Sequence, residues 1–237
     1  MPAAALQDIH PMLWRGSQLA RATGRVVDTG YPTLSAELPG GGWPIGTLIE
    51  LLLQQSGVGE MRLLRPALIV QSKKSIALLQ PPQIPNALAF AYLGMNPAQV
   101  MWLRAQKSAD ALWSAEQVLK TGSCGALVFW QQHIRTESLR RLQLAAQSSE
   151  TLFVVVRPLA SAPDSSPASL RIAVRPAEGG VAIDIIKRKG PTSSQRLLVA
   201  IEPSPILLSP HTRTRRKFSD ARPAVIEQTS ADAESAP

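Results

Sequence analysis

Apolar residues follow two different spacings along the chain. From about residue 47 to residue 158, short runs that are continuously apolar, such as 126–130 and 152–156, are separated by segments in which apolar residues recur every three or four positions. A continuous apolar run is typical of a strand buried on both faces, and the second spacing is typical of an amphipathic helix. Strands that alternate with helices predict an α/β fold with a mostly parallel sheet and flanking helices.

This alternation gives a definite order of elements. Strands are predicted over 47–53, 75–80, 99–105, 124–131 and 151–158, and helices over 59–72, 84–94, 108–122 and 136–150. Ser108 is the expected N-cap of the third helix, and Gly94 and Gly122 are expected to end the second and third helices. Pro66 must lie in the first turn of its helix or bend it.

The spacing changes after Pro158. Apolar and polar residues then alternate in two arms around the turn 176–180, which predicts a late β-hairpin, and a further short strand is expected over 196–202. The inward-facing hairpin residues are expected to be Leu170, Ile172, Val174, Val181, Ile183 and Ile185.

Three regions follow from these patterns. A helical arm is expected over 1–30, where Leu13, Trp14 and Leu19 recur at helical spacing. The α/β core is expected over 31–204. The stretch 205–237, rich in Pro, Ser, Thr and Ala and containing a basic cluster, is expected to be a flexible, disordered tail.

Composition narrows the class of protein. The sequence has no run of about 18 apolar residues, so we expect no transmembrane helix, and its start lacks the features of a secretory signal. The single cysteine, Cys124, excludes an internal disulfide framework and favours the cytoplasm. Three dispersed histidines argue against a structural zinc site, and the formal net charge of +8 favours an acidic partner, either nucleic acid or protein.

The stretch SGVGEM lies between a predicted strand and a predicted helix, where a nucleotide-binding protein carries its phosphate loop. If Gly59 is the second glycine of that motif, Gln54 replaces the first glycine, Glu60 the lysine and Met61 the magnesium-binding hydroxyl. A glutamate would repel a triphosphate, and a thioether is a poor magnesium ligand. Gly57, Gly59, Glu60 and Met61 therefore form a degenerate phosphate loop.

Acidic residues are also missing where an ATPase would need them. Trp130 and Gln131 stand at the strand end where a metal-binding aspartate is expected, and Gln80, Pro81 and Pro82 stand where a catalytic glutamate is expected. We therefore predict no ATP hydrolysis, no cofactor and no metal, and a protein that is not an enzyme.

Several ordered blocks resemble one bacterial family. LPGGGWPIGTLIEL is similar to the glycine-rich element that precedes the phosphate loop of RecA-type recombinases. With PPQIPNALAFAYLG, WLRA, DALWSAEQVLKTGSCGALVFW and RRLQLAAQ, it resembles the ImuA family of RecA/SulA-like proteins over roughly residues 30–200. The resemblance implies a RecA-like fold without a functional ATPase.

The same resemblance implies a role in the SOS response to DNA damage. The protein would be a non-catalytic accessory protein of error-prone translesion synthesis, which supports mutagenesis during DNA repair. Its implied partners are ImuB, a Y-family-like polymerase homologue, and RecA, with a DnaE-type error-prone polymerase reached through ImuB and any contact with DNA indirect.

Two other readings stay open. Family members are also described as SulA-like, which implies a cell-division inhibitor that binds FtsZ. A weak, atypical ATPase is the third reading, and it predicts saturable, magnesium-dependent ATP binding. The chain is longer than SulA proteins, which favours the accessory role over division inhibition.

The predicted elements also give expected positions for the tryptophans and for the pair Cys124 and His133. Trp102, Trp113 and Trp130 are expected in the core rather than on a base-stacking surface, and Trp43 is expected to be more exposed. Cys124 and His133 bracket one strand and are not expected to form a nucleophile and base.

Basic residues supply the candidate partner sites. Arg140 and Arg141 are expected on the solvent face of their helix, and Lys187, Arg188 and Lys189 at the hairpin end could contact phosphates. The densest basic cluster is the candidate partner-binding segment, and it consists of Arg213, Arg215, Arg216, Lys217 and Phe218.

Overall fold

The computed structural model of the chain describes residues 24–190 and 195–201. The strands in this part are β1 (Val26–Asp28), β2 (Gly42–Pro44), β3 (Leu48–Leu53), β4 (Ser75–Leu79), β5 (Val100–Leu103), β6 (Cys124–Trp130), β7 (Leu152–Pro158), β8 (Leu170–Ala177), β9 (Gly180–Lys187) and β10 (Leu197–Ala200). The α-helices are α2 (Pro32–Glu37), α3 (Glu60–Gln71), α4 (Ala87–Tyr92), α5 (Ser108–Thr121) and α6 (Thr136–Gln147), and short 3₁₀ turns are η2 (Pro39–Gly41), η3 (Pro97–Gln99) and η4 (Leu159–Ser161).

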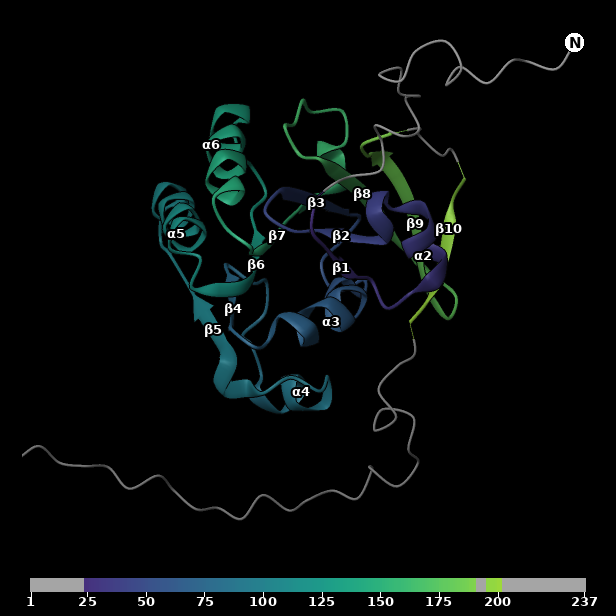
Figure 1. The fold of residues 1–237 in the computed structure, drawn as a ribbon, viewed down its shortest axis with the longest axis horizontal. Helices are drawn as coiled ribbons and strands as arrows, with labels where there is room; N and C mark the ends of the chain where they lie inside the picture. Colours follow the sequence, from purple (N-terminus) through teal and green to yellow (C-terminus); the bar gives the residue numbers. More distant parts are fainter. Residues whose placement is uncertain (1–23, 191–194, 202–237) are drawn as a thin grey trace, which may run out of the picture. The chain divides into compact units, whose positions relative to one another are not determined.

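Eight of these strands form one mixed sheet (Figure 1) in the order β10-β9-β8-β3-β7-β6-β4-β5. The six strands from β8 to β5 in this order are parallel to one another, whereas β9 pairs antiparallel with β8 and β10 antiparallel with β9. The predicted α/β fold with a mostly parallel sheet, and the late hairpin of β8 and β9, are therefore confirmed. All six hairpin residues expected to face inward are buried.

Each face of the sheet has its own core. Ile49 and Leu51 of β3 pack in the cluster that contains Leu63 and Phe90 of α3 and α4, whereas Leu48 packs in the cluster of α5 and α6. Successive side chains of a strand point to opposite faces, so one apolar strand serves both clusters. This double burial is the reason that the central strands are continuously apolar.

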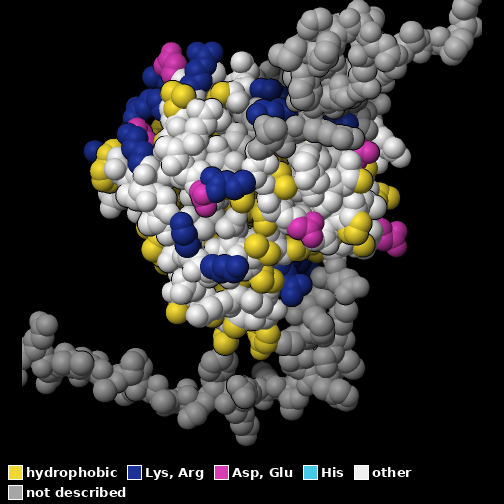
Figure 2. All heavy atoms as spheres, viewed as in Figure 1, with side chains coloured by type: hydrophobic (Ala, Val, Ile, Leu, Met, Phe, Trp, Pro, Cys, Tyr) yellow, Lys and Arg dark blue, Asp and Glu magenta, His cyan; other side chains and the backbone are white. Residues whose placement is uncertain are grey.

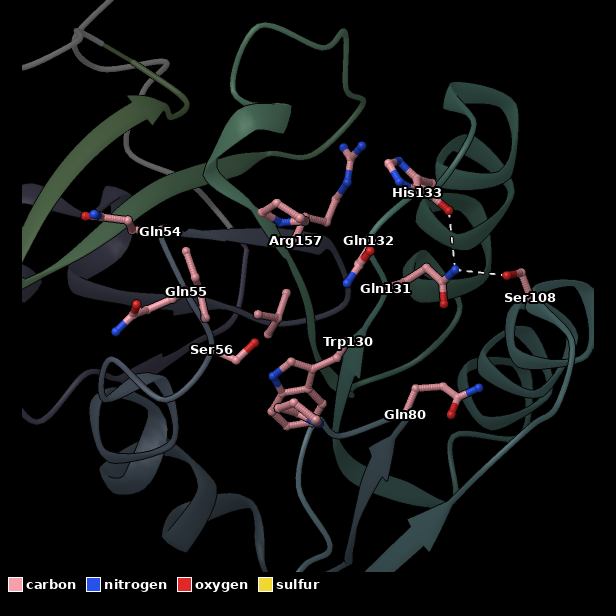
Figure 3. Close-up of a pocket in the computed structure, with 14 residues that line it drawn as sticks. Gln54, Gln55, Ser56, Gln80, Ser108, Trp130, Gln131, Gln132, His133 and Arg157 are labelled. Carbon is pink, nitrogen blue, oxygen red and sulfur yellow. Dashed lines mark hydrogen bonds between the residues drawn. The ribbon is translucent and has the colours of Figure 1, made fainter.

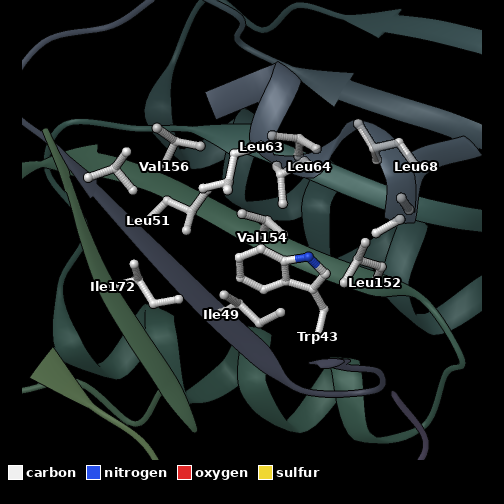
Figure 4. Close-up of a cluster of buried hydrophobic side chains, with 14 of the residues drawn as sticks. Trp43, Ile49, Leu51, Leu63, Leu64, Leu68, Leu152, Val154, Val156 and Ile172 are labelled. Carbon is white, nitrogen blue, oxygen red and sulfur yellow. The ribbon is translucent and has the colours of Figure 1, made fainter. Parts of the chain in front are cut away.

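Trp43 lies at the centre of the first cluster (Figure 4). Its side chain is completely buried, so the expectation that Trp43 is exposed was wrong. The cause is the short strand β2, which pairs with β1 and directs the indole onto the sheet. Residues 1–23 of the expected helical arm lie outside the described residues, and its last part forms strand β1 rather than helix.

Two other tryptophans contradict the expectation of a core position. Trp102 and Trp113 have exposed fractions of 45% and 62%, whereas Trp130 is buried as predicted. Trp102 lies on β5, the edge strand of the sheet, where fewer neighbouring side chains surround it than on a central strand. Trp113 lies on α5, whose buried residues are Ala111, Ala115 and Leu119, so the indole is on the outer side of the helix.

Pro66 lies in the middle of α3, not in its first turn. A proline there cannot donate to the carbonyl four residues earlier, which belongs to Arg62. The hydroxyl of Tyr31 donates to this carbonyl instead, with an oxygen–oxygen distance of 3.0 Å. Gly30 packs directly on the proline ring, because a Cβ at Gly30 would lie 2.4 Å from the Pro66 Cβ. The segment before α2 thus supports the helix where the proline weakens it.

The remaining helix ends are close to those predicted. Gly122 ends α5 in the left-handed conformation, and Gly94 follows α4 in the same conformation. Ser108 is the first residue of α5 and not its N-cap, which is Lys107. The Ser108 hydroxyl accepts a hydrogen bond from Gln131 at the end of β6 instead. Within the described ranges, no helix has the length and apolar character needed to cross a bilayer.

Candidate functional site

The loop between β3 and α3, with the first turn of α3, contains SGVGEM, the stretch predicted to be a degenerate phosphate loop. Gly57 and Gly59 have φ angles of +87° and +116°, which lie in the region that favours glycine. Glu60 is the first residue of α3, and its side chain turns back into the loop. The Glu60 carboxylate accepts hydrogen bonds from the amide of Gly57 at 3.0 and 3.1 Å and from the amide of Gly59 at 3.2 Å.

Glu60 is buried, with an exposed fraction of 4%. A negative charge at the N-terminus of a helix is favoured by the helix dipole and by the free amides of the first turn. In a phosphate loop the same kind of amides receive the phosphate oxygens. Here the amides of Gly57 and Gly59 receive a carboxylate from the chain itself, so a phosphate would have to displace Glu60.

Met61 does not face a metal position. Its side chain is partly buried and packs against the core cluster beneath α3. Gln54, at the place of the first glycine, is exposed at the end of β3. Met61 therefore supplies no oxygen ligand, whereas the Gln54 side chain lines the cavity beside the loop.

A cavity of about 650 Å³ opens beside this loop, at the carboxyl ends of β3, β4, β6 and β7 (Figure 3). Its polar lining consists of Gln54, Gln55, Ser56, Gln80, Ser108, Gln131, Gln132, His133 and Arg157. No Asp or Glu lines the cavity. A site for magnesium-dependent phosphoryl transfer needs carboxylates, and amide side chains occupy these strand ends instead.

Two of these glutamines form hydrogen bonds between segments that follow the carboxyl ends of the strands. The side-chain nitrogen of Gln131 donates to the hydroxyl of Ser108 at 3.1 Å and to the carbonyl of His133 at 3.4 Å. The side-chain nitrogen of Gln80 donates to the carbonyl of Ala105. Gln80 has a φ of +55°, the only positive value among the described residues that are not glycine. Both side chains are thus bound within the protein, at the positions where an ATPase would carry acids.

An ionic cluster lies beneath the cavity and was not expected from the sequence. Glu50 of β3 is completely buried and accepts from Arg157 of β7 at 2.9 Å and from Arg171 of β8 at 2.6 Å. Arg157 also pairs with Asp164 at 2.9 Å. Arg171 donates to the carbonyls of Ser161, Ala162 and Asp164, so the cluster fastens the loop between β7 and β8.

The signal for this cluster is present in the sequence but is ambiguous. Glu50 interrupts an otherwise apolar strand, and a charged residue is almost never buried without a partner. The partners Arg157 and Arg171 are 107 and 121 residues away along the chain. Only the strand order, which places β3 between β7 and β8, identifies them.

The basic end of the β8–β9 hairpin lies at the other end of the parallel strands, away from the first cavity. Lys187, Arg188 and Lys189 border a second cavity of about 620 Å³, at the amino ends of the parallel strands. Lys187 donates to the carbonyl of Ser166 at 2.8 Å, and Arg188 pairs with Glu37 at 2.8 Å. Lys187 and Arg188 are therefore already bound within the protein.

Other candidates from the sequence stand apart. Cys124 and His133 lie at opposite ends of β6, as predicted. Burial raises the pKa of the Cys124 thiol, which suppresses its reactivity. Arg140 and Arg141 are exposed on α6. Among the described residues, no group of three or more His, Cys, Asp or Glu side chains could hold a metal ion.

The candidate partner-binding cluster at the C-terminus lies outside the described residues. It comprises Arg213, Arg215, Arg216, Lys217 and Phe218, and its role stays a prediction from the sequence.

No protein-family model matches the chain, and no curated protein matches it. The proposal of a function therefore depends on the loop, the cavity beside it and the resemblance seen in the sequence.

Proposed function

We propose that this protein is a non-catalytic accessory protein of SOS-induced, error-prone translesion DNA synthesis in the cytoplasm. It would bind an ImuB-like polymerase homologue and RecA, and reach a DnaE-type polymerase through ImuB. The fold would be a RecA-like core that has kept its framework and lost its ATPase chemistry.

The contact of Glu60 with Gly57 and Gly59 is the observation that carries the non-catalytic part. A protein that used ATP would keep these amides available for phosphate oxygens. Here a buried carboxylate holds both, and the neighbouring strand ends carry Gln80 and Gln131. A protein that keeps the loop without the lysine, the hydroxyl and the acids is suited to binding partners rather than to hydrolysis.

The cellular context is supported by the ordered resemblance to the ImuA family and by the net charge of +8. A basic protein is attracted to acidic partners. The basic cluster from Arg213 to Phe218 is the proposed docking segment, in which Phe218 is a small apolar anchor between charged residues.

The test is a deletion of the gene with measurement of damage-induced mutagenesis. We expect mutagenesis to fall in the deletion strain and to be restored by the intact gene and by a Gln54→Ala control. Unchanged mutagenesis in the deletion strain would overturn the proposed function. An adjacent pair of genes for a Y-family homologue and a DnaE-type polymerase would support it.

Partner binding is tested separately with purified proteins. Deletion of residues 209–237 is expected to weaken the affinity for ImuB, for RecA or for both, because it removes the basic cluster. Unchanged affinity for both partners would rule out this docking segment and leave the core as the binding surface.

A further inference from the structure

Exposed apolar side chains gather at the β5 edge of the sheet. They belong to β5, to α4 and to the loop before α4, and we call them the β5 edge surface: Ile84, Leu88, Tyr92 and Trp102. Ile84 and Leu88 have exposed fractions of 75% and 67%. Apolar side chains protrude from the part of the molecule that carries α4 (Figures 1 and 2). Exposed apolar clusters of this kind mark binding surfaces.

Helix α4 and the side chain of Trp102 lie on the same side of the sheet, whereas Met101 points to the other side. Val100 of β5 packs against the core cluster that contains Phe90 of α4. Side chains two residues apart on a strand share a face, so Trp102 points to the same side as Val100. Leu88 and Tyr92 are four residues apart on α4 and lie together on its exposed side.

The backbone of β5 has a free side. Within the described ranges, β5 pairs with β4 alone. The carbonyl of Leu103 accepts from the amide of Gln80 at the end of β4, at 3.0 Å. Successive residues of a strand direct their backbone groups to opposite sides, so the amide and carbonyl of Trp102 point away from β4. A free strand edge of this kind can pair with another extended chain.

The chain segments that form this edge are mostly basic, and the first acid after them is Asp110, in the first turn of α5. Between Met61 and Ala109 the chain contains six Lys or Arg residues and no Asp or Glu. Arg104 and Lys107 are exposed directly after β5. Arg65 is exposed on α3 and donates to the carbonyl of Leu93, at the end of α4, at 2.7 Å. Such a surface attracts an acidic partner and repels a second copy of itself.

We propose that the β5 edge surface binds an extended, acidic segment of a partner protein, which pairs with β5 as an added strand. Backbone pairing would provide affinity, and the apolar residues of α4 and β5 would select apolar side chains between the acidic ones. The aliphatic residues Ile84 and Leu88, together with the free backbone groups, suit a polypeptide better than a nucleic acid. This inference goes beyond the proposed function and does not depend on it, because it names no pathway.

The test uses a labelled peptide of about ten residues in which Val and Glu alternate, a length that covers the strand with both flanks. Fluorescence anisotropy with the full chain is expected to show saturable binding that weakens as salt is added. The same peptide with Lys in place of Glu is expected not to bind. Absence of saturable binding by the acidic peptide, or equal binding by both peptides, would overturn the proposal.

Variants at Trp102 separate the backbone from the side chain. Trp102→Pro removes an amide that points away from β4, so the sheet is expected to remain, while peptide affinity falls about tenfold or more. Trp102→Val keeps the amide and is expected to lose less. Leu88→Glu, on the exposed side of α4, repels the acidic peptide without disturbing the strand. Trp113→Ala is the matched control, because Trp113 is also exposed but lies on α5.

Two further measurements test whether the surface binds single-stranded nucleic acid or a second copy of the chain instead. Binding of oligothymidylate that is lost in Trp102→Val and in Leu88→Glu would assign the surface to single-stranded nucleic acid. A dimer in sedimentation experiments that dissociates in the same variants would assign it to a second copy. Either result, or peptide affinity that is the same in Trp102→Pro, Leu88→Glu and the wild type, would contradict the proposal.

Discussion

At the scale of single residues, two buried carboxylates, Glu60 and Glu50, form hydrogen bonds and ion pairs within the fold. Glu60 binds the amides of its own loop, and Glu50 binds Arg157 and Arg171 across three strands. The loop therefore contains an anion as a fixed part of the structure. An incoming phosphate would have to compete with this carboxylate for the amides of Gly57 and Gly59.

Substitution of Glu60 tests this directly. Glu60→Gln keeps the shape but places an amide nitrogen near amide donors, so the free energy of unfolding is expected to fall by about 1–2 kcal/mol. Glu60→Lys is expected to destabilise the protein further and to give no ATP hydrolysis. Urea denaturation and a magnesium-dependent ATPase assay measure the two effects, with Gln54→Ala as the control in the same loop. Measurable turnover by Glu60→Lys would show that the rest of the site is more complete than proposed.

Glu50 is expected to matter more for stability than any exposed acid. Glu50→Gln leaves buried Arg171 without its charge partner and Arg157 with Asp164 alone, and the expected loss is about 3 kcal/mol or more. Glu150→Gln is the matched control, because Glu150 pairs with Arg25 at the surface and should cost less than about 1 kcal/mol. Chemical denaturation measures both. Equal losses in the two variants would contradict the structural role of the cluster.

Cys124 predicts a pH dependence at the alkaline end. Burial raises the pKa of the thiol above its ordinary value of 9.0, so the folded protein keeps its proton where the unfolded chain loses it. The contribution to stability is therefore complete below pH 9.0 and is lost as the pH rises through the folded pKa. Cys124→Ala should show a smaller fall in the free energy of unfolding over this range. Identical pH profiles for the two proteins would exclude this role for the thiol.

At the scale of elements, α3 shows how a helix can contain a proline. Pro66 leaves the Arg62 carbonyl without its helical donor, and Tyr31 supplies one from a segment outside the helix. Helix α3 and the segment before α2 therefore depend on each other. The prediction that Pro66 must lie in the first turn or bend the helix followed from the local rule, which does not consider donors from distant residues.

This dependence is measurable at Tyr31 and Gly30. Tyr31→Phe removes the hydroxyl and should lower the free energy of unfolding by about 1 kcal/mol. Gly30→Ala should cost clearly more than Gly41→Ala, although the φ angles of +77° and +79° are nearly equal, because only a Cβ at Gly30 meets Pro66. Thermal and urea denaturation compare the variants. Equal costs for the two glycine variants would show that the Pro66 contact contributes nothing.

Elements also show where prediction from sequence succeeded. Runs such as 126–130 and 152–156 were recognised as buried strands because apolar periodicity is a local property. The predicted core positions of Trp102 and Trp113 were wrong, because the burial of a side chain is not a local property. An apolar residue in a strand or helix is buried only if another element covers it, and β5 lies at an edge of the sheet.

At the scale of the whole molecule, the positive charge is unevenly distributed. The stretch from Met61 to Ala109 contributes six of the positive charges and no negative ones, and it ends beside the β5 edge. The formal net charge of +8 is a sum over the whole chain, and it does not show that six positive charges share one acid-free stretch.

Charge reversal tests the distribution at constant net charge. Arg104→Glu changes the acid-free region, whereas Arg140→Glu changes an exposed position on α6, three residues from Glu137. We expect Arg104→Glu to reduce retention on a cation-exchange resin more than Arg140→Glu does, because adjacent charges of one sign act together within a Debye length. The same order is expected for the affinity of the acidic peptide. Equal retention of the two variants would mean that net charge alone decides.

The sequence by itself determined the order of strands and helices, the parallel character of the sheet and the absence of the lysine and acids of an ATPase. These features follow from local periodicity and from residue identity. The tertiary structure decided that the carboxylate of Glu60 occupies the loop, that Glu50 meets two arginines more than a hundred residues away, and that β5 has a free side. These features depend on strand order and side-chain direction, which arise only when distant parts of the chain pack together.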